Sequence, residues 1–128
     1  MTELQQKQLN FLTDTVNHFN INNRGVDPKT GKCSYEYGCA IGRHLDQNLA
    51  KRFDYFPLGV DLFTGVRINN EIAFNELDPK LKELGRMFLA EIQQLHDNAR
   101  NWNKHGLSEY GQNNLNKLKT YYGLNTEN

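Results

Sequence analysis

Reactive side chains gather in one short stretch of this chain. Residues 31–45 hold both cysteines, Cys33 and Cys39, together with three glycines, two tyrosines and a histidine. A second reactive group, His96-Asp97, lies much later in the sequence. These residue types are typical of a nucleophilic site, a metal site or a ligand pocket.

Nucleophilic chemistry would use Cys39 with His96 as its base. If Cys39 begins a helix, the free amides and the macrodipole there favour its thiolate, and the chain would be a cysteine-dependent hydrolase or transferase. Neighbouring helical residues point about 100° apart, so the sequence predicts no direct hydrogen bond between His96 and Asp97. Cysteine is also among the most buried residue types, and Ala40 and Ile41 indicate a packed corner. We therefore interpret Cys39 as structural and keep the enzyme as the alternative.

Metal binding has suitable residue types but unsuitable spacing. Cys33, Cys39, His44 and His96 would form a Cys2His2 set, yet five residues separate the cysteines where zinc sites usually have two to four. The His-Asp pair is also shared with the HD metal-dependent phosphohydrolases, which need a later aspartate, and none follows Asp97. The sequence predicts no metal site and no cofactor.

Ligand binding uses the same stretch differently. A glycine before a helix start lets backbone amides face a phosphate or carboxylate, and nearby basic side chains add charge and donors. Aromatic rings offer flat faces for stacking. The predicted ligand site comprises Tyr35, Gly38, Cys39, Arg43, His44, His96 and Trp102. In the competing interpretation the rings of Tyr35 and Trp102 belong to the core, and His96 donates to a backbone carbonyl.

Three helices are predicted to position these groups. Thr2 and Gln5 have capping-box spacing and predict a helix from about Glu3 to Phe19. Asp78-Pro79 predicts a second helix start, with the helix reaching Asn101. A last helix is expected from Ser108 to Gly123. The apolar stripes of these helices are Leu9, Leu12, Val16 and Phe19; Leu81, Leu84, Phe88, Ile92 and Leu95; and Tyr110, Leu115, Leu118 and Tyr122.

The middle of the chain is predicted in less detail. Residues 33–37 alternate as a short strand or hairpin does, and helical spacing begins at Cys39 and continues to Leu49. Residues 54–77 are apolar but interrupted by proline and glycine, which indicates packed irregular structure. The second stripe is expected to bury against the helix near Cys39, which would bring His96 toward the 33–42 corner.

Two blocks carry a resemblance to a group of small uncharacterised proteins of bacteriophages and bacterial genomes. Cys33-Ser34-Tyr35 and Cys39-Ala40-Ile41-Gly42, with a leucine at 45, resemble their C-x-Y … C-A-[IV]-G … L pattern. Leu95-His96-Asp97, with glutamine before it and Trp102 after it, resembles their L-Q-x-x-H-D … W stretch. The chain departs from the pattern after Leu45, where members have a proline-acid turn. The resemblance implies a phage-like context and a functional pairing of the two blocks, not a reaction.

Composition narrows the class of protein further. The 128 residues suit one domain, 1–128, and Lys plus Arg equals Asp plus Glu at 15 each. A balanced chain without a basic stripe predicts no nucleic-acid partner. No signal peptide and no long apolar run is present, so we expect no membrane partner and a cytoplasmic location, in the host cell if the chain is phage-encoded. Two cysteines are too few for a disulfide scaffold.

These observations favour a mainly α, compact single domain of three or four helices with a small strand or hairpin near residues 33–37. The predicted function is a non-enzymatic, phage-type accessory protein that binds a small anionic ligand, nucleotides included, or a host protein. Sequestering a nucleotide signal used in host defence is the most concrete version of this hypothesis. A homo-oligomer is compatible with the sequence. Fold-level reasoning does not separate this binder from the cysteine-dependent enzyme.

Overall fold

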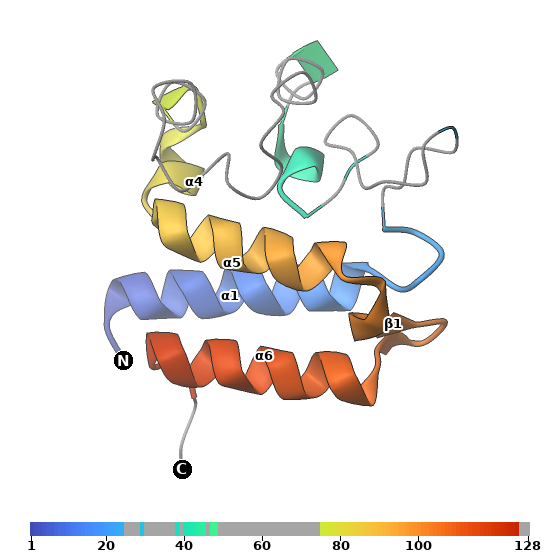
Figure 1. Ribbon diagram of the computed structural model, residues 1–128. Coiled ribbons are helices and arrows are strands. Elements are labelled where there is room, and N and C mark those ends of the chain that lie inside the picture. Colours follow the sequence, from blue (N-terminus) through green and yellow to red (C-terminus); the bar gives the residue numbers. More distant parts are fainter. Residues whose placement is uncertain (25–28, 30–37, 39, 46, 49–74, 126–128) are drawn as a thin grey trace.

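The protein is mainly helical, as the sequence predicts. The computed structural model describes residues 1–24, 29, 38, 40–45, 47–48 and 75–125 (Figure 1). The α-helices with both ends inside these ranges are α1 (Glu3–His18), α4 (Pro79–Lys82), α5 (Arg86–Asp97) and α6 (Glu109–Tyr122). The expected strand at 33–37 and most of the expected irregular segment lie outside the described residues. No helix in the described ranges has the length and apolar character needed to cross a membrane.

The predicted helix starts are confirmed by their caps. The Thr2 hydroxyl accepts a hydrogen bond from the Gln5 amide at 3.0 Å, and the Gln5 side chain accepts one from the Thr2 amide at 2.8 Å. The Asp78 carboxylate accepts from the Lys80 amide at 2.9 Å, with Pro79 in the first turn of α4. Ser108 accepts from the Gly111 amide at 3.0 Å. Each cap satisfies amides that the helix itself leaves unpaired, which is why these starts are visible in the sequence.

The single helix expected from Asp78 to Asn101 is wrong. Helix α4 ends at Lys82, and Gly85, with a φ of 97°, separates it from α5. Positive φ is easily adopted only by glycine, so the apolar stripe continues across a break in the backbone. Helix α5 ends at Asp97, and the 3₁₀ helix η3 (Ala99–Asn101) follows it.

The helix expected from Cys39 to Leu49 is wrong over residues 40–45, whereas Gln47 and Asn48 are helical as expected. Ala40 and Ile41 form a turn, and the 3₁₀ helix η1 (Gly42–His44) follows, with the His44 amide donating to the Ile41 carbonyl at 3.0 Å. Glycine in an α-helix costs about 1 kcal/mol relative to alanine, so Gly42 weakens an α-helix here. Ala40 and Ile41 are nevertheless fully buried.

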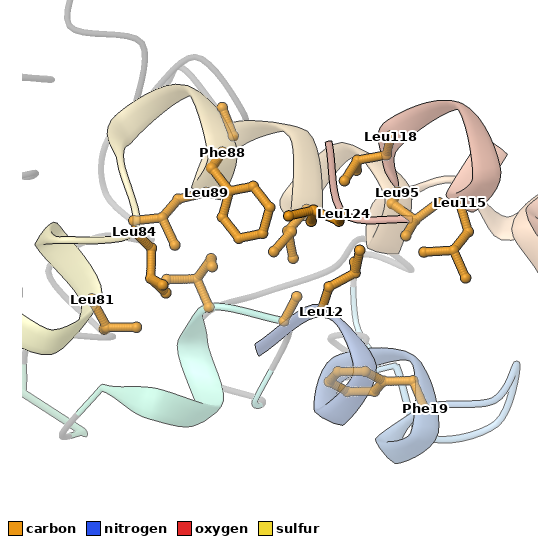
Figure 2. Close-up of a cluster of buried hydrophobic side chains, with 14 of the residues drawn as sticks. Leu12, Phe19, Leu81, Leu84, Phe88, Leu89, Leu95, Leu115, Leu118 and Leu124 are labelled. Carbon is orange, nitrogen blue, oxygen red and sulfur yellow. The ribbon is translucent and has the colours of Figure 1, made fainter. Parts of the chain in front are cut away.

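One hydrophobic core joins the described elements (Figure 2). Helices α1, α5 and α6 lie side by side (Figure 1), and the Gln8 side chain of α1 donates to the Leu84 carbonyl at 2.9 Å. The second predicted stripe is buried along its length, and Ile41 belongs to the same core. Tyr110 was expected on the apolar stripe of α6, but its side chain is exposed and packs against the Arg100 guanidinium.

A small antiparallel hairpin lies between η3 and α6. Strand β1 (Trp102–Asn103) pairs with β2 (Gly106–Leu107), Trp102 opposite Leu107. The Ile21 amide donates to the Asn103 carbonyl at 2.9 Å. This bond ties the segment after α1 to the hairpin, and thereby places the end of α1 beside Trp102.

Candidate functional site

A hydrogen-bond chain connects the Ala40-Ile41 turn to the end of α5. The Ile41 amide donates to the Gln93 side-chain oxygen at 3.3 Å, and the Gln93 side-chain nitrogen donates to Asp97 Oδ1 at 2.8 Å. The same carboxylate oxygen lies 3.0 Å from His96 Nδ1. The two blocks that the sequence singled out are therefore in direct contact through Gln93, a residue that sequence reasoning did not place in the site.

The His96–Asp97 hydrogen bond contradicts the expectation that adjacent helical residues could not form it. Both polar atoms lie only two bonds beyond Cβ, so they meet close to the backbone even though the side chains diverge. Because a carboxylate only accepts, His96 Nδ1 carries a proton. When the ring is neutral, its Nε2 is then the basic nitrogen.

The second nitrogen of His96 has no partner among the described residues. The side chain is fully buried, and Nε2 makes no hydrogen bond within the described part of the chain. A buried polar atom left unpaired costs about 1–3 kcal/mol, so an exception of this kind needs an explanation. An imidazole oriented by a carboxylate can serve as a base, as a metal ligand or, once protonated, as a donor to an anion.

Two further groups hold this end of α5 in place. The Trp102 indole donates to the His96 carbonyl at 3.0 Å, and an Arg24 guanidinium nitrogen lies 3.2 Å from the same oxygen and 3.3 Å from the Asp97 carbonyl. The last carbonyls of a helix lack intrahelical donors, and a cation there also interacts favourably with the helix dipole. Trp102 is 4% exposed, which leaves little of its face open for stacking. Sequence reasoning missed Arg24 because it lies in a polar loop.

Arg43 contacts the Phe19 ring, and the Phe19 ring in turn contacts His96 near the end of α5. Its guanidinium carbon is 5.7 Å from the Phe19 ring centre, and the Phe19 ring meets the His96 ring edge to face at 4.7 Å. A guanidinium nitrogen of Arg43 donates to the Asp14 carboxylate, and this hydrogen bond lowers the pKa of Asp14. Arg43 Nε is buried without a partner among the described residues. We call Phe19, Arg43, His96 and Trp102 the Phe19 cluster.

The remaining predicted site residues have different surroundings. Gly38 has a φ of 85°, and a Cβ there would lie 3.9 Å from the Arg43 Cβ, so Gly38 is adjacent to the cluster. His44 is exposed, and its ring packs against that of Phe11 with the ring centres 4.9 Å apart. Partial loss of hydration, and after it the nearby Arg43 charge, lower the pKa of His44. Tyr35 and Cys39 lie outside the described residues. Within the described ranges, no three potential metal ligands come together.

The structure thus brings Arg43, His96 and Trp102 around Phe19, a residue predicted only as part of an apolar stripe. Comparison with protein-family models, with curated proteins and with solved structures gave no match for this chain.

Proposed function

We propose that the chain is a non-enzymatic, phage-type accessory protein that binds a small anionic ligand at the Phe19 cluster. One observation carries this proposal: two buried nitrogen atoms, Arg43 Nε and His96 Nε2, lack partners within the described residues, and both side chains contact the Phe19 ring. Arginine is always protonated, and its Nε–H can only donate. Acceptor oxygens of a bound ligand would supply the partners that these nitrogens lack.

This arrangement of donors favours a negatively charged ligand. The Arg43 guanidinium is a permanent positive charge that donates to the Asp14 carboxylate, and His96 Nδ1 lies against the Asp97 carboxylate. Hydrogen bonds to charged groups are worth about 1.5–3 kcal/mol, more than neutral ones. Phosphate or a nucleotide phosphate is therefore the proposed ligand class. Sequestering a nucleotide signal of host defence is the role that the phage resemblance supports.

Titration calorimetry with inorganic phosphate and then AMP tests the proposal. We expect saturable binding, weakened about tenfold or more by Arg43→Lys, which keeps the charge and removes Nε, and by His96→Gln. His105→Gln is the matched control, because His105 lies exposed in the turn between β1 and β2. Circular dichroism checks that each variant is folded. Absence of saturable binding of both probes, or equal affinity in all variants, would refute the proposal.

The second candidate function is a cysteine-dependent hydrolase or transferase that uses Cys39 and His96. It is favoured by the Asp97-oriented imidazole, which has the form of a general base with a free Nε2. An activated thiolate alkylates rapidly at neutral pH. Under the binding proposal we expect Cys39 to react with iodoacetamide no faster than a model thiol, as peptide mass spectrometry would show. Rapid labelling of Cys39, lost in the His96→Gln variant, would favour the enzyme.

A further inference from the structure

A groove of about 410 Å³ lies between α5 and α6, and no residue of the Phe19 cluster lines it. Leu95 of α5 and Leu118 of α6 line its apolar part, and both belong to the core. The two helices are in contact with each other. Sites for small molecules are typically clefts of this size that combine an apolar surface with a few placed polar groups.

The polar lining of the groove consists largely of carboxamides from both sides. They are Gln94 of α5, Asn98 at the C-terminal cap of α5, Asn101 of η3 and Asn114 of α6. The buried Asn101 is used structurally: its nitrogen donates to the Leu95 carbonyl at 2.8 Å, and its oxygen accepts from the Asn114 nitrogen at 2.9 Å. This fixes the Asn114 amide in one orientation, with its oxygen left to accept.

Gln94 offers both a donor and an acceptor. Its side chain is exposed and forms no hydrogen bond within the described part of the chain. A carboxamide presents one NH₂ and one carbonyl side by side, and this pair matches a ligand edge that carries an acceptor next to a donor. In nucleic-acid recognition, asparagine and glutamine read adenine in this way.

Charge in the groove is balanced. Glu91 of α5 and Lys117 of α6 both line it, and they form no ion pair with each other or with any other described residue. Burial, and then the Glu91 charge, raise the pKa of Tyr122, so its hydroxyl stays protonated as a donor. One positive and one negative group favour a ligand without net charge, unlike the Phe19 cluster.

Tyr121 supplies an exposed aromatic face at the groove. Its side chain is 81% exposed, the largest exposure among the big hydrophobic residues described, and its ring meets Tyr122 edge to face at 4.9 Å. The contact with Tyr122 restrains the ring and leaves a face open. Bases stack on such rings regardless of sequence.

We propose that this groove binds an uncharged purine base or its nucleoside. A purine has a flat apolar face for Tyr121, edges with adjacent donors and acceptors for Gln94 and Asn114, and no charge to unbalance Glu91 and Lys117. The site is separate from the Phe19 cluster and does not depend on the function proposed there.

Adenosine is the probe, titrated into the full chain and followed by saturation-transfer NMR and calorimetry. We expect saturable binding that Tyr121→Ala weakens about tenfold, because the stacking surface is lost, while Tyr121→Phe retains it. Tyr110→Ala is the matched control: Tyr110 is also an exposed tyrosine on α6, but it does not line the groove. Gln94→Ala should weaken adenosine binding, whereas Gln112→Ala, an exposed glutamine outside the groove, should not.

Three outcomes would overturn the proposal. They are no saturable binding of adenosine, equal affinity in the Tyr121→Ala and Tyr110→Ala variants, and equally tight binding of ribose, which has no base to stack. His96→Gln should leave adenosine affinity unchanged even if it abolishes phosphate binding. The failure of one site can therefore be distinguished from the failure of the other.

Discussion

At the scale of single residues, the site is controlled by hydrogen bonds between charged groups and buried partners. Arg43 is held by Asp14 on α1 and lies over Phe19. His96 is held by Asp97, and its carbonyl is held by Trp102 and Arg24. These contacts hold the two side chains in place. Under the binding proposal, Arg43 Nε and His96 Nε2, which lack partners within the described residues, are positioned before the ligand binds, and this would lower the entropic cost of binding.

The Asp14–Arg43 pair should make stability depend on acidic pH. The hydrogen bond from Arg43 lowers the pKa of Asp14 below its unperturbed value of 3.8 in the folded state. The unfolded chain then binds a proton first, so this contribution to stability is present above pH 3.8 and is lost as pH falls through the folded pKa. Urea unfolding from pH 5 to about pH 2 should show a shallower loss of stability for Asp14→Asn than for the wild type.

Glu109→Gln is the control for this measurement, since Glu109 is exposed at the start of α6, away from Arg43. A pH dependence of Asp14→Asn as steep as that of the wild type would mean that the pair contributes nothing in solution. Because Asp14 is largely exposed, we expect a modest effect that high salt reduces.

Sequence reasoning predicted residue types better than residue contacts. It selected Arg43, His96 and Trp102 by chemistry, and the structure brings all three around one ring. It excluded the His96–Asp97 hydrogen bond because helical direction was applied to whole side chains and not to atoms near the backbone. It did not select Gln93 or Arg24, because their roles depend on partners distant in sequence, the Ile41 amide and the carbonyls that end α5.

At the scale of elements, local signals determine helix starts and glycine determines several boundaries. Thr2, Asp78 and Ser108 cap within a few residues of themselves, so their starts could be predicted. The break at Gly85 and the end of α5 could not be predicted from the apolar stripe, because the stripe continues across both helices. The glycine itself was the available signal.

Gly111 permits the close approach of α6 to η3. A Cβ at this position would lie 2.1 Å from the Asn101 carbonyl oxygen and 2.8 Å from its carbon, and neither backbone atom can move without shifting η3. We therefore expect Gly111→Ala to destabilise the fold by about 1–3 kcal/mol despite the better helix propensity of alanine. Urea unfolding followed by far-UV circular dichroism measures the change.

Asn113→Ala, an exposed substitution on the same helix, is the control and should change stability by less than about 0.5 kcal/mol. If Gly111→Ala were as stable as Asn113→Ala, the contact between α6 and η3 would be looser in solution than the distances indicate. Gly111→Ala also tests the groove, because a Cβ at residue 111 would displace Asn101, which lines the groove together with Asn114.

At the scale of the whole molecule, side-chain bonds to backbone connect elements that are far apart in sequence. Gln5 of α1 donates to the Tyr122 carbonyl at 3.2 Å, and Gln8 donates to the Leu84 carbonyl at 2.9 Å. Helix α1 is therefore tied to the end of α6 and to the start of α5. The mainly helical class could be predicted from apolar periodicity, whereas these ties could not, because a polar residue on a helix gives no indication of its distant partner.

Phe19 contacts both Arg43 and His96, the two residues proposed to bind the ligand. It is 3% exposed, and its ring lies 4.7 Å from that of His96 and 6.1 Å from that of Trp102. Truncating a buried phenylalanine to alanine costs about 3–5 kcal/mol and leaves a cavity. We expect Phe19→Ala to lose this much stability, Phe19→Leu to lose less, and both to shift the emission of Trp102, the one tryptophan in the chain, to longer wavelength as water reaches it.

Phe11→Ala provides the comparison, because Phe11 is only partly buried and packs against His44 instead of His96. It should cost less stability and leave Trp102 emission unchanged. Urea titrations monitored by Trp102 fluorescence give both quantities for each variant, and phosphate titration of the folded Phe19→Leu protein adds a functional measure. Because the leucine no longer presents a ring to the Arg43 guanidinium or to the His96 edge, phosphate affinity should fall together with the emission shift. Equal costs for the Phe11 and Phe19 substitutions, with unchanged emission and affinity, would show that Phe19 is an ordinary core residue and that Arg43 and His96 do not form one site.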